Sequence, residues 1–310
     1  MAFNLKNEID FMGKRKISII FSLILIIASI FFVATRGLNL GLDFTGGTVV
    51  EVGYPEAADL DKIRADLKSG GFERATAQHF GTSKEVLIRI APRDGEDRAS
   101  TSDDILALLK ESSGGQLEMR RVEFVGPQIG EELKEDGGLA MLYALIGILI
   151  YVAFRFEYRF SIGAIVALIH DVIITVGFFA LTRMEFDLTV LAAVLAVIGY
   201  SLNDTIVVFD RIRENFILLR KGDSEKVVNT SINQTISRTI VTSLTTLLVL
   251  GALFFFGGEI IHSFAVALIV GVIIGTYSSI YVASNALLAL GVSREDLLPP
   301  ERDEELDKIP

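Results

Sequence analysis

Residues 199–211 read Gly-Tyr-Ser-Leu-Asn-Asp-Thr-Ile-Val-Val-Phe-Asp-Arg, an apolar, small-residue segment that contains an Asn-Asp pair. Together with the apolar residues before it, from Leu188 on, this segment is long enough to cross the hydrocarbon of a bilayer. A carboxylate inside such a span is energetically costly, and an intramembrane ionisable residue is by default a functional candidate. The stretch therefore indicates a membrane protein in which Asp204 has a function.

The composition of the whole chain agrees with a polytopic membrane protein. Of its 310 residues, 51% are apolar, and they are gathered in long blocks. With no Cys and only three His, the chain offers no disulfide framework and no recognisable metal site. A net charge of −10 argues against nucleic-acid binding, and no phosphate-binding loop is present. We expect no cofactor and no metal.

Six segments are apolar and long enough to form transmembrane helices. The first, Ile17–Ala34, is expected to be a retained signal anchor, because no small-x-small cleavage site follows it. The other five are expected near residues 138–154, 160–182, 188–209, 235–256 and 263–290. The predicted domains are an N-terminus at 1–16, a first helix at 17–35, an insertion at 36–136, helices two to six at 137–290, and an acidic tail at 291–310.

The distribution of basic residues predicts the orientation in the membrane. With six spans, both termini lie on one side. Basic residues at 14–16, 155, 159 and between 211 and 226 all fall on that side, whereas the short loops on the other side carry little positive charge. By the positive-inside rule the termini are cytoplasmic and the insertion is outside.

The insertion predicts a compact α+β domain. Strands are expected at 48–54, 75–80, 84–91 and 117–125, with one helix at 57–68 and another capped by Ser102-Asp103-Asp104. The order β-α-β-β-α-β is the ferredoxin-like arrangement. The glycine-rich segment 41–48 lies where the first span meets this domain. It either sets the angle between them or is simply a turn that leads into the first strand.

Between the fourth and fifth spans, Phe209, Ile212, Phe216 and Leu219 follow a helical spacing. They predict either an amphipathic helix at the cytoplasmic interface or a helix that covers the ends of its own bundle. Gly222 is expected to end this helix, and Ser224 is expected to cap the next.

Three ionisable residues fall inside predicted spans: Asp171, Asp204 and Arg238. At helical rise, Asp204 and Arg238 lie about 24 and 27 Å below the outer surface on antiparallel spans, and Asp171 about 16 Å below it. Arg238 could therefore approach and withdraw from Asp204 and couple proton passage to a conformational change. The alternative is a static ion pair that fixes the helix register. For His170-Asp171 a purely hydrogen-bonding role is equally open.

Stripes of small and polar residues lie beside these ionisable residues. Ala192, Ala196, Gly199 and Asn203 form a small-residue stripe bordered by Asp204, and Gly271 and Gly275 give the last span a small contact face. The fifth span carries a polar stripe at 231, 235, 238, 242 and 245, which is expected to face the small-residue stripe.

Five motifs together resemble the SecF branch of the SecD/SecF family of protein-export membrane proteins. They are residues 41–47 (Gly-Leu-Asp-Phe-Thr-Gly-Gly), 125–130, 155–160, His170-Asp171, and 199–205 with the continuation Arg-Ile-Arg-Glu-Asn at 211–215. The first motif alone would also fit SecD, whereas the last motif and the single small outer domain favour SecF.

This resemblance implies a multi-pass protein of the bacterial inner membrane with a periplasmic outer domain. Its six helices would be one half of a resistance-nodulation-division (RND) type core, and SecD would supply the other half. The pair would associate with the SecYEG channel and use the proton-motive force to draw unfolded preproteins outward after the SecA ATPase has pushed them; YajC and YidC are further partners that it suggests.

The resemblance also implies roles for single residues. Asp204 and Arg238 match proton-pathway residues that work with a SecD carboxylate, Asn203 belongs to the same motif, and Asp171 matches another. Gly41, Asp43, Phe44, Gly46 and Gly47 form the glycine motif. The leading hypothesis is thus a proton-driven, non-enzymatic subunit of preprotein translocation. The alternatives are an RND-type exporter half for a small molecule or lipid, and a passive assembly factor.

Overall fold

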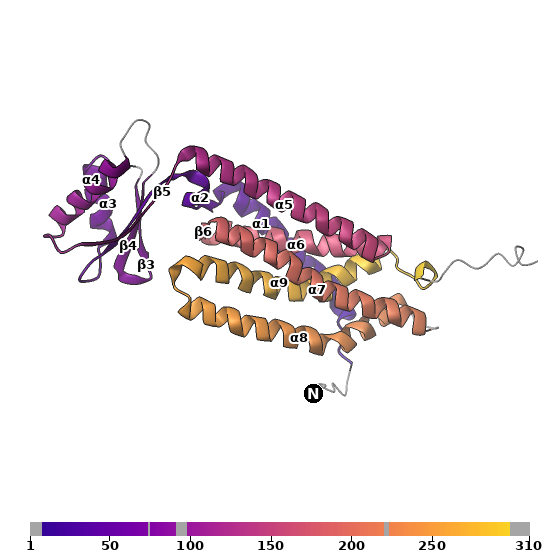
Figure 1. The fold of residues 1–310 in the computed structure, drawn as a ribbon. Helices are drawn as coiled ribbons and strands as arrows, with labels where there is room; N and C mark the ends of the chain where they lie inside the picture. Colours follow the sequence, from indigo (N-terminus) through magenta and orange to yellow (C-terminus); the bar gives the residue numbers. More distant parts are fainter. Residues whose placement is uncertain (1–7, 74, 91–97, 220–222, 298–310) are drawn as a thin grey trace, which may run out of the picture.

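The computed structural model describes residues 8–73, 75–90, 98–219 and 223–297. Within that part of the chain, six helices are long and apolar enough to cross a membrane, as the sequence predicted. They lie side by side as one bundle, with a small sheet domain at one end (Figure 1). The helices are α1 (Arg15–Arg36), α5 (Pro127–Arg155), α6 (Tyr158–Thr182), α7 (Leu188–Leu218), α8 (Ser224–Phe256) and α9 (Glu259–Ala289). Residues 1–7 of the expected N-terminus, the helix end expected at Gly222, and residues 298–310 of the expected tail (291–310) lie outside the described residues.

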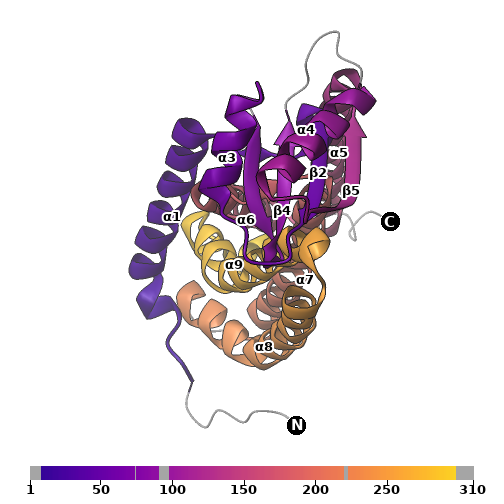
Figure 2. The ribbon, with the colours of Figure 1, turned by 90° about the vertical axis from the view of Figure 1, so that its left-hand side faces the viewer.

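Three of the helices form the centre of the bundle. In the most apolar parts of α6, α7 and α9 at least half of the residues are buried, against 11–17% in α1, α5 and α8. Figure 2, seen from the end that carries the sheet domain, shows α1 and α8 at the periphery. The outer faces of α1, α5 and α8 are therefore available to lipid or to another protein.

Glycine allows the central helices to approach closely. A Cβ on Gly271 of α9 would stand 2.0 Å from Val197 Cγ2 of α7, and one on Gly275 would stand 3.0 Å from Ser201 Cβ. The predicted small contact face of the last span is thus confirmed.

The sheet domain between α1 and α5 has the predicted ferredoxin-like topology. Its elements are β2 (Gly47–Gly53), α3 (Leu60–Ser69), β3 (Thr76–Phe80), β4 (Thr82–Ile90), α4 (Arg98–Ser112) and β5 (Glu118–Val125). The strands pair antiparallel in the order β3-β4-β2-β5. Val50, Ile88 and Ile105 are among the buried residues that join the sheet to its helices. Because α4 begins at Arg98, Ser102 lies inside the helix and not at its cap, contrary to the expectation.

The segment after the fourth span differs from one of the two expectations. No separate interfacial helix follows Phe209, because α7 continues without a break to Leu218. Phe209, Ile212 and Phe216 are buried in the same cluster as residues of α6 and α8, so this part of α7 covers the end of its own bundle. The next helix starts earlier than expected, at Ser224, and Asp223 occupies its N-cap position in place of Ser224. In the same way α5 begins at Pro127, within the range 36–136 that was expected for the insertion.

Candidate functional site: buried carboxylates and the joint to the sheet domain

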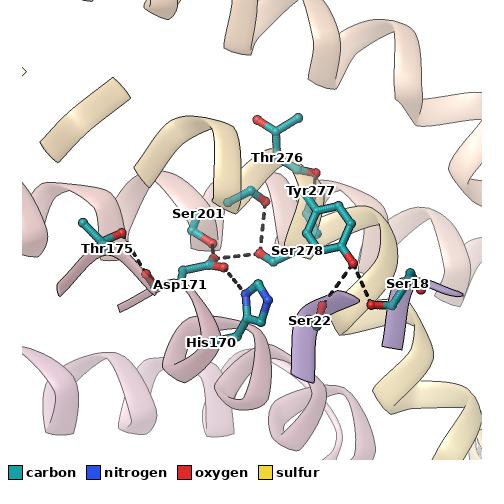
Figure 3. A network of polar contacts seen from close by, with 11 residues as sticks. Ser18, Ser22, His170, Asp171, Thr175, Ser201, Thr276, Tyr277 and Ser278 are labelled. Carbon is teal, nitrogen blue, oxygen red and sulfur yellow. Dashed lines mark hydrogen bonds and ion pairs between the residues drawn. The ribbon is translucent and has the colours of Figure 1, made fainter. Parts of the chain in front are cut away.

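Asp171 lies in the middle of α6 and is fully enclosed, with 1% of its surface exposed. Its Oδ2 accepts hydrogen bonds from Ser278 Oγ of α9 (2.7 Å) and from Ser201 Oγ of α7, and its Oδ1 lies 2.8 Å from His170 Nδ1 (Figure 3). Hydrogen bonds to a carboxylate are stronger than those between neutral groups, and they offset the cost of its burial. The carboxylate therefore connects all three central helices.

A second set of contacts extends this network to α1. The His170 ring stacks on Tyr277 of α9, with ring centroids 6.1 Å apart. The Tyr277 hydroxyl donates to the carbonyl of Ser18 (2.8 Å) and lies 3.0 Å from Ser22 Oγ (Figure 3). His170 Nε2, which is buried, has no hydrogen-bond partner among the described residues. The polar network thus crosses the bundle from α7 to α1.

Asp204 lies one helical turn after Ser201 on α7 and is also buried, with 3% of its surface exposed. Ser243 of α8 and Arg238 are the neighbours that act on its carboxylate. The Ser243 hydroxyl is in turn 2.7 Å from Thr276 Oγ1 of α9. Oδ2 of Asp204 has no hydrogen-bond partner among the described residues. Of the two acids, Asp171 is thus bonded on both oxygens, whereas one oxygen of Asp204 has no hydrogen-bond partner among the described residues.

The predicted pair of Asp204 and Arg238 is close enough to interact electrostatically, as the depth estimate indicated. The described residues show no direct ion pair between them, however, and Arg238 is exposed on α8. Asn203 is exposed as well, one residue before the buried Asp204. Both polar groups therefore lie on the surface of the bundle, at about the same depth in the membrane as the buried Asp204.

The small-residue stripe of α7 is exposed together with Asn203. Ala192, Ala196 and Gly199 all lie on the surface of the bundle. The expectation that this stripe faces the polar stripe of α8 is wrong: Ser231 and Thr235 are buried at one end of α8, and Arg238 and Thr245 are exposed further along. The rotation of each helix about its axis, which the sequence does not give, decides this outcome.

The glycine motif forms the joint between the bundle and the sheet domain. β1 (Asn39–Leu40) pairs in parallel with β6 (Glu185–Phe186), and α2 (Leu42–Thr45) follows directly. Asp43 Oδ2 accepts a hydrogen bond from the backbone N–H of Leu188 (3.0 Å), the first residue of α7. Asp187, at the N-cap of α7, accepts from Val190 N–H (2.8 Å). The motif is therefore attached to the start of the helix that carries Asp204.

Gly47 of this joint and Gly130 of α5 are required by the backbone. Gly47 has φ +125°, a conformation that is essentially restricted to glycine, and a Cβ there would stand 2.4 Å from the Ile90 carbonyl oxygen. A Cβ on Gly130 of α5 would stand 2.8 Å from the amide nitrogen of Gly46. Phe44 is buried beside Phe186, with ring centroids 6.3 Å apart. The segment is thus packed between the bundle and the sheet domain, and it is more than a turn that leads into the first strand.

Arg89 of β4 holds the sheet domain against this joint. Its guanidinium forms an ion pair with Glu185. Burial lowers the pKa of Arg89, and the negative charges of Asp187 and Asp43 oppose this shift. A charged pocket of about 270 Å³ surrounds these groups. No motif of the sequence pointed to Arg89, Ser278 or Ser243, and the motif at 199–205 contains Ser201 without indicating its role, because these roles depend on contacts between distant elements.

Comparison with known families agrees with this geometry. The model of the C-terminal region of the SecD/SecF protein-export membrane proteins matches residues 105–293, and the SecD/SecF GG motif matches residues 31–54. The chain belongs to the SecD/SecF family. Within that family it is 52% identical over 308 residues to the protein translocase subunit SecF of Vibrio alginolyticus, with 98% of both chains covered. It is 50% identical to the SecF subunit of Pseudomonas aeruginosa, covering 97% of this chain and 98% of that one.

A solved SecD/SecF structure shows the same fold. The crystal structure of SecDF from Thermus thermophilus, a translocon-associated membrane protein, superposes with a TM-score of 0.83 at 39% identity. The superposition covers 94% of this chain, and the chain spans 40% of the SecDF chain. The GG motif of the family coincides with the joint described above, and the region of the C-terminal model contains both buried acids.

Proposed function

We propose that this chain is the SecF subunit of a SecDF accessory complex of the Sec translocase. In this proposal it uses the proton-motive force to promote preprotein translocation after SecA-driven export, without covalent chemistry of its own. The observation that carries the proposal is the buried, incompletely bonded Asp204 behind a surface on which Asn203 and Arg238 are exposed. A proton site of this kind needs a second half to enclose it.

We infer that a SecD half packs on the exposed face of α7, between α5 and α8. The small residues Ala192, Ala196 and Gly199 allow a neighbouring helix to approach closely. An exposed guanidinium in the hydrocarbon is costly, so Arg238 requires a polar surface opposite it. A SecD carboxylate there would compete with Asp204 for Arg238, and this competition would set which acid holds the proton.

Asp171 is proposed as a second acid of the proton pathway. Ser201 links it to the helix turn that carries Asp204, and His170 links it to the α1 side. The alternative is a static hydrogen-bond centre that fixes the three central helices. Substitution of Asp171 by Asn distinguishes the two roles.

The location and the remaining partners follow from the same proposal. The chain would lie in the inner membrane with its termini in the cytoplasm and the sheet domain in the periplasm, where it would contact the emerging unfolded preprotein. The exposed Lys14 and Lys16 at the end of the bundle away from the sheet domain support this orientation. SecYEG would be a direct partner and SecA an indirect one, with YajC and YidC as further members.

The test is proton-dependent export in vesicles that contain the Sec translocase, SecD and this chain. Export of a preprotein is measured at constant ATP with and without a protonophore. We expect Asp204→Asn to reduce export to the level seen with the protonophore. Asp210→Asn is the matched control, because Asp210 lies on the same helix but is partly exposed and paired with Arg155.

The outcomes separate the candidate functions. If the Asp204→Asn complex still responded fully to the proton-motive force, the proton role would be refuted and a passive assembly role favoured. Proton-coupled movement of a small solute or lipid by the complex, without an effect on preprotein export, would favour the exporter alternative.

A further inference from the structure

A groove of about 370 Å³ lies between α1, α6 and α9, on the side of the bundle opposite the exposed face of α7. Its walls are almost entirely apolar, with Leu23 of α1, Ile169 of α6 and Val282 of α9 among them. Leu23 and Ile169 are about half exposed, so the groove is open to the hydrocarbon. Through His170, Ser18 and Ser22 it borders the polar network that contains Asp171.

Two buried polar atoms in this groove lack hydrogen-bond partners among the described residues: His170 Nε2 and Asn285 Oδ1. The two residues are 2% and 9% exposed. Their other polar atoms are already engaged, since Asn285 Nδ2 donates to Ser18 Oγ (3.0 Å) and His170 Nδ1 contacts Asp171. Buried polar groups are ordinarily bonded, so the two free atoms indicate ordered water, or a polar part of an occupant, beside them.

The groove runs from one surface of the membrane towards its middle. Asn285 lies about 6 Å from the end of α9, whereas His170 lies about 18 Å from the start of α6, both at helical rise. Both ends are on the side away from the sheet domain (Figure 1). Lys14 and Lys16, both exposed, stand within a turn of Ser18 at the mouth of the groove. The neighbouring Arg15 is paired with Glu225 (2.7 Å), whereas neither lysine forms an ion pair among the described residues.

We propose that this groove binds one acyl chain of an anionic phospholipid, whose phosphate lies at Lys14 and Lys16. An apolar cavity of about 150 Å³ holds one benzene molecule, so about 370 Å³ accommodates roughly fifteen carbon atoms, the size of an acyl chain. One turn of a helix, about 11 Å wide and 5.4 Å high, would need roughly 500 Å³. The volume, the apolar walls and the positive charge at the mouth therefore favour a lipid over a protein helix.

An acyl chain in this position would also separate His170 from bulk water. The His170 ring borders the groove, so water enclosed beneath the bound chain would be the hydrogen-bond partner of its Nε2. Asn285 and Ser18, nearer the surface, would meet the glycerol and ester region of the lipid or its ordered water. Bound lipid would thus close the α1 side of the polar network.

The test is photolabelling of the full chain in phosphatidylcholine nanodiscs. Phosphatidylglycerol or phosphatidylcholine probes with the same photoreactive acyl chain are added, and labelled residues are located by mass spectrometry. We expect labels on residues 19–26 and 166–170, with the anionic probe preferred by about five-fold for each lysine. Ala286→Phe, which fills the groove, should abolish this labelling, whereas Ala252→Phe on the exposed face of α8 should leave it unchanged.

A second variant keeps the test independent of the folding of Ala286→Phe. Replacing both Lys14 and Lys16 by Gln should bring the anionic probe down to the level of the neutral one while the groove itself is intact. Equal labelling of the groove by both probes in the unmodified chain would overturn the anionic lipid site. Labelling spread evenly over α5 and α8, or unaffected by Ala286→Phe, would overturn the groove as a site.

Discussion

Substituting Asp171 by Asn distinguishes a proton-carrying role from a static one. The change keeps the shape of the side chain and removes its charge. Each hydrogen bond to a charged group contributes about 1.5–3 kcal/mol, and each neutral one about 0.5–1.5 kcal/mol. The contacts with Ser201, Ser278 and His170 together therefore lose roughly 3–4.5 kcal/mol. Removing a carboxylate from the middle of a membrane helix regains about 2.5–3.5 kcal/mol.

Because these two contributions nearly cancel, Asp171→Asn should change the free energy of unfolding by less than about 2 kcal/mol. Asp171→Ala should be less stable than Asp171→Asn by roughly 1.5–4.5 kcal/mol, because it also loses the three neutral hydrogen bonds of about 0.5–1.5 kcal/mol each. Ser278→Ala is the matched control. It removes one bond of about 1.5–3 kcal/mol but keeps the acid. The free energies are measured by denaturant unfolding of the chain, followed by far-ultraviolet circular dichroism.

The same variants are then compared in the vesicle assay of proton-dependent export. If Asp171 carries protons, Asp171→Asn should abolish the response to the proton-motive force at nearly normal stability. Ser278→Ala should do the reverse, with lower stability and a retained response. A full response in Asp171→Asn would refute the proton role and leave Asp171 as a hydrogen-bond centre.

Three further outcomes are expected from the same structure. Gly47→Ala should cost more stability than Gly114→Ala, because both glycines have positive φ but only at Gly47 would the Cβ meet a backbone oxygen; thermal unfolding of the two variants compares them. Gly271→Ala should cost about 1–3 kcal/mol through overpacking between α7 and α9, whereas Gly251→Ala, with open space around it, should gain about 0.5–1 kcal/mol. Burial, with a smaller contribution from a nearby carboxylate, raises the pKa of Tyr54 to about 12. This contribution to stability is complete below about pH 10, the ordinary pKa, and is lost as the pH rises through 12; the difference in ultraviolet titration between the chain and Tyr54→Phe measures it.

Each of these outcomes can fail independently. Equal losses of stability in Gly47→Ala and Gly114→Ala would show that the backbone at Ile90 moves to make room for the Cβ. A neutral Gly271→Ala would show that α7 and α9 can separate without cost. A Tyr54 hydroxyl that titrates near pH 10 would show that water reaches the end of β2.

The sequence predicted the six spans and the order of the sheet domain because both depend on local periodicity. The continuation of α7 to Leu218 was not decided by the sequence, since Phe209, Ile212 and Phe216 show the same spacing in an interfacial helix and in a packed one. Only contact with α8 distinguishes the two. The two-residue pairing of β1 with β6 has no local signal at all, because a bridge of that length depends on where α1 and α6 end.

Depth along a helix was predictable from residue counts, whereas rotation about its axis was not. Asp204 and Arg238 were placed at one level, and they are electrostatic neighbours. The outward turn of Arg238 and the inward turn of Asp171 towards Ser278 depend on how α6, α8 and α9 are rotated against α7. These rotations are set by close contacts such as that of Gly271 with Val197, which involve residues far apart in the chain.

The bond from Asp43 to the first residue of α7 has a mechanical consequence. Asp204 lies about 24 Å along the same unbroken helix. An α-helix resists compression along its axis, so an axial displacement at the level of Asp204 would reach Leu188 almost undiminished. There Asp43 and the pairing of β1 with β6 would pass it to the glycine motif, and the ion pair of Arg89 with Glu185 would carry it into the sheet. Stiffness along α7, with no need for a flexible link, is sufficient to make the position of the outer domain depend on a charge inside the membrane.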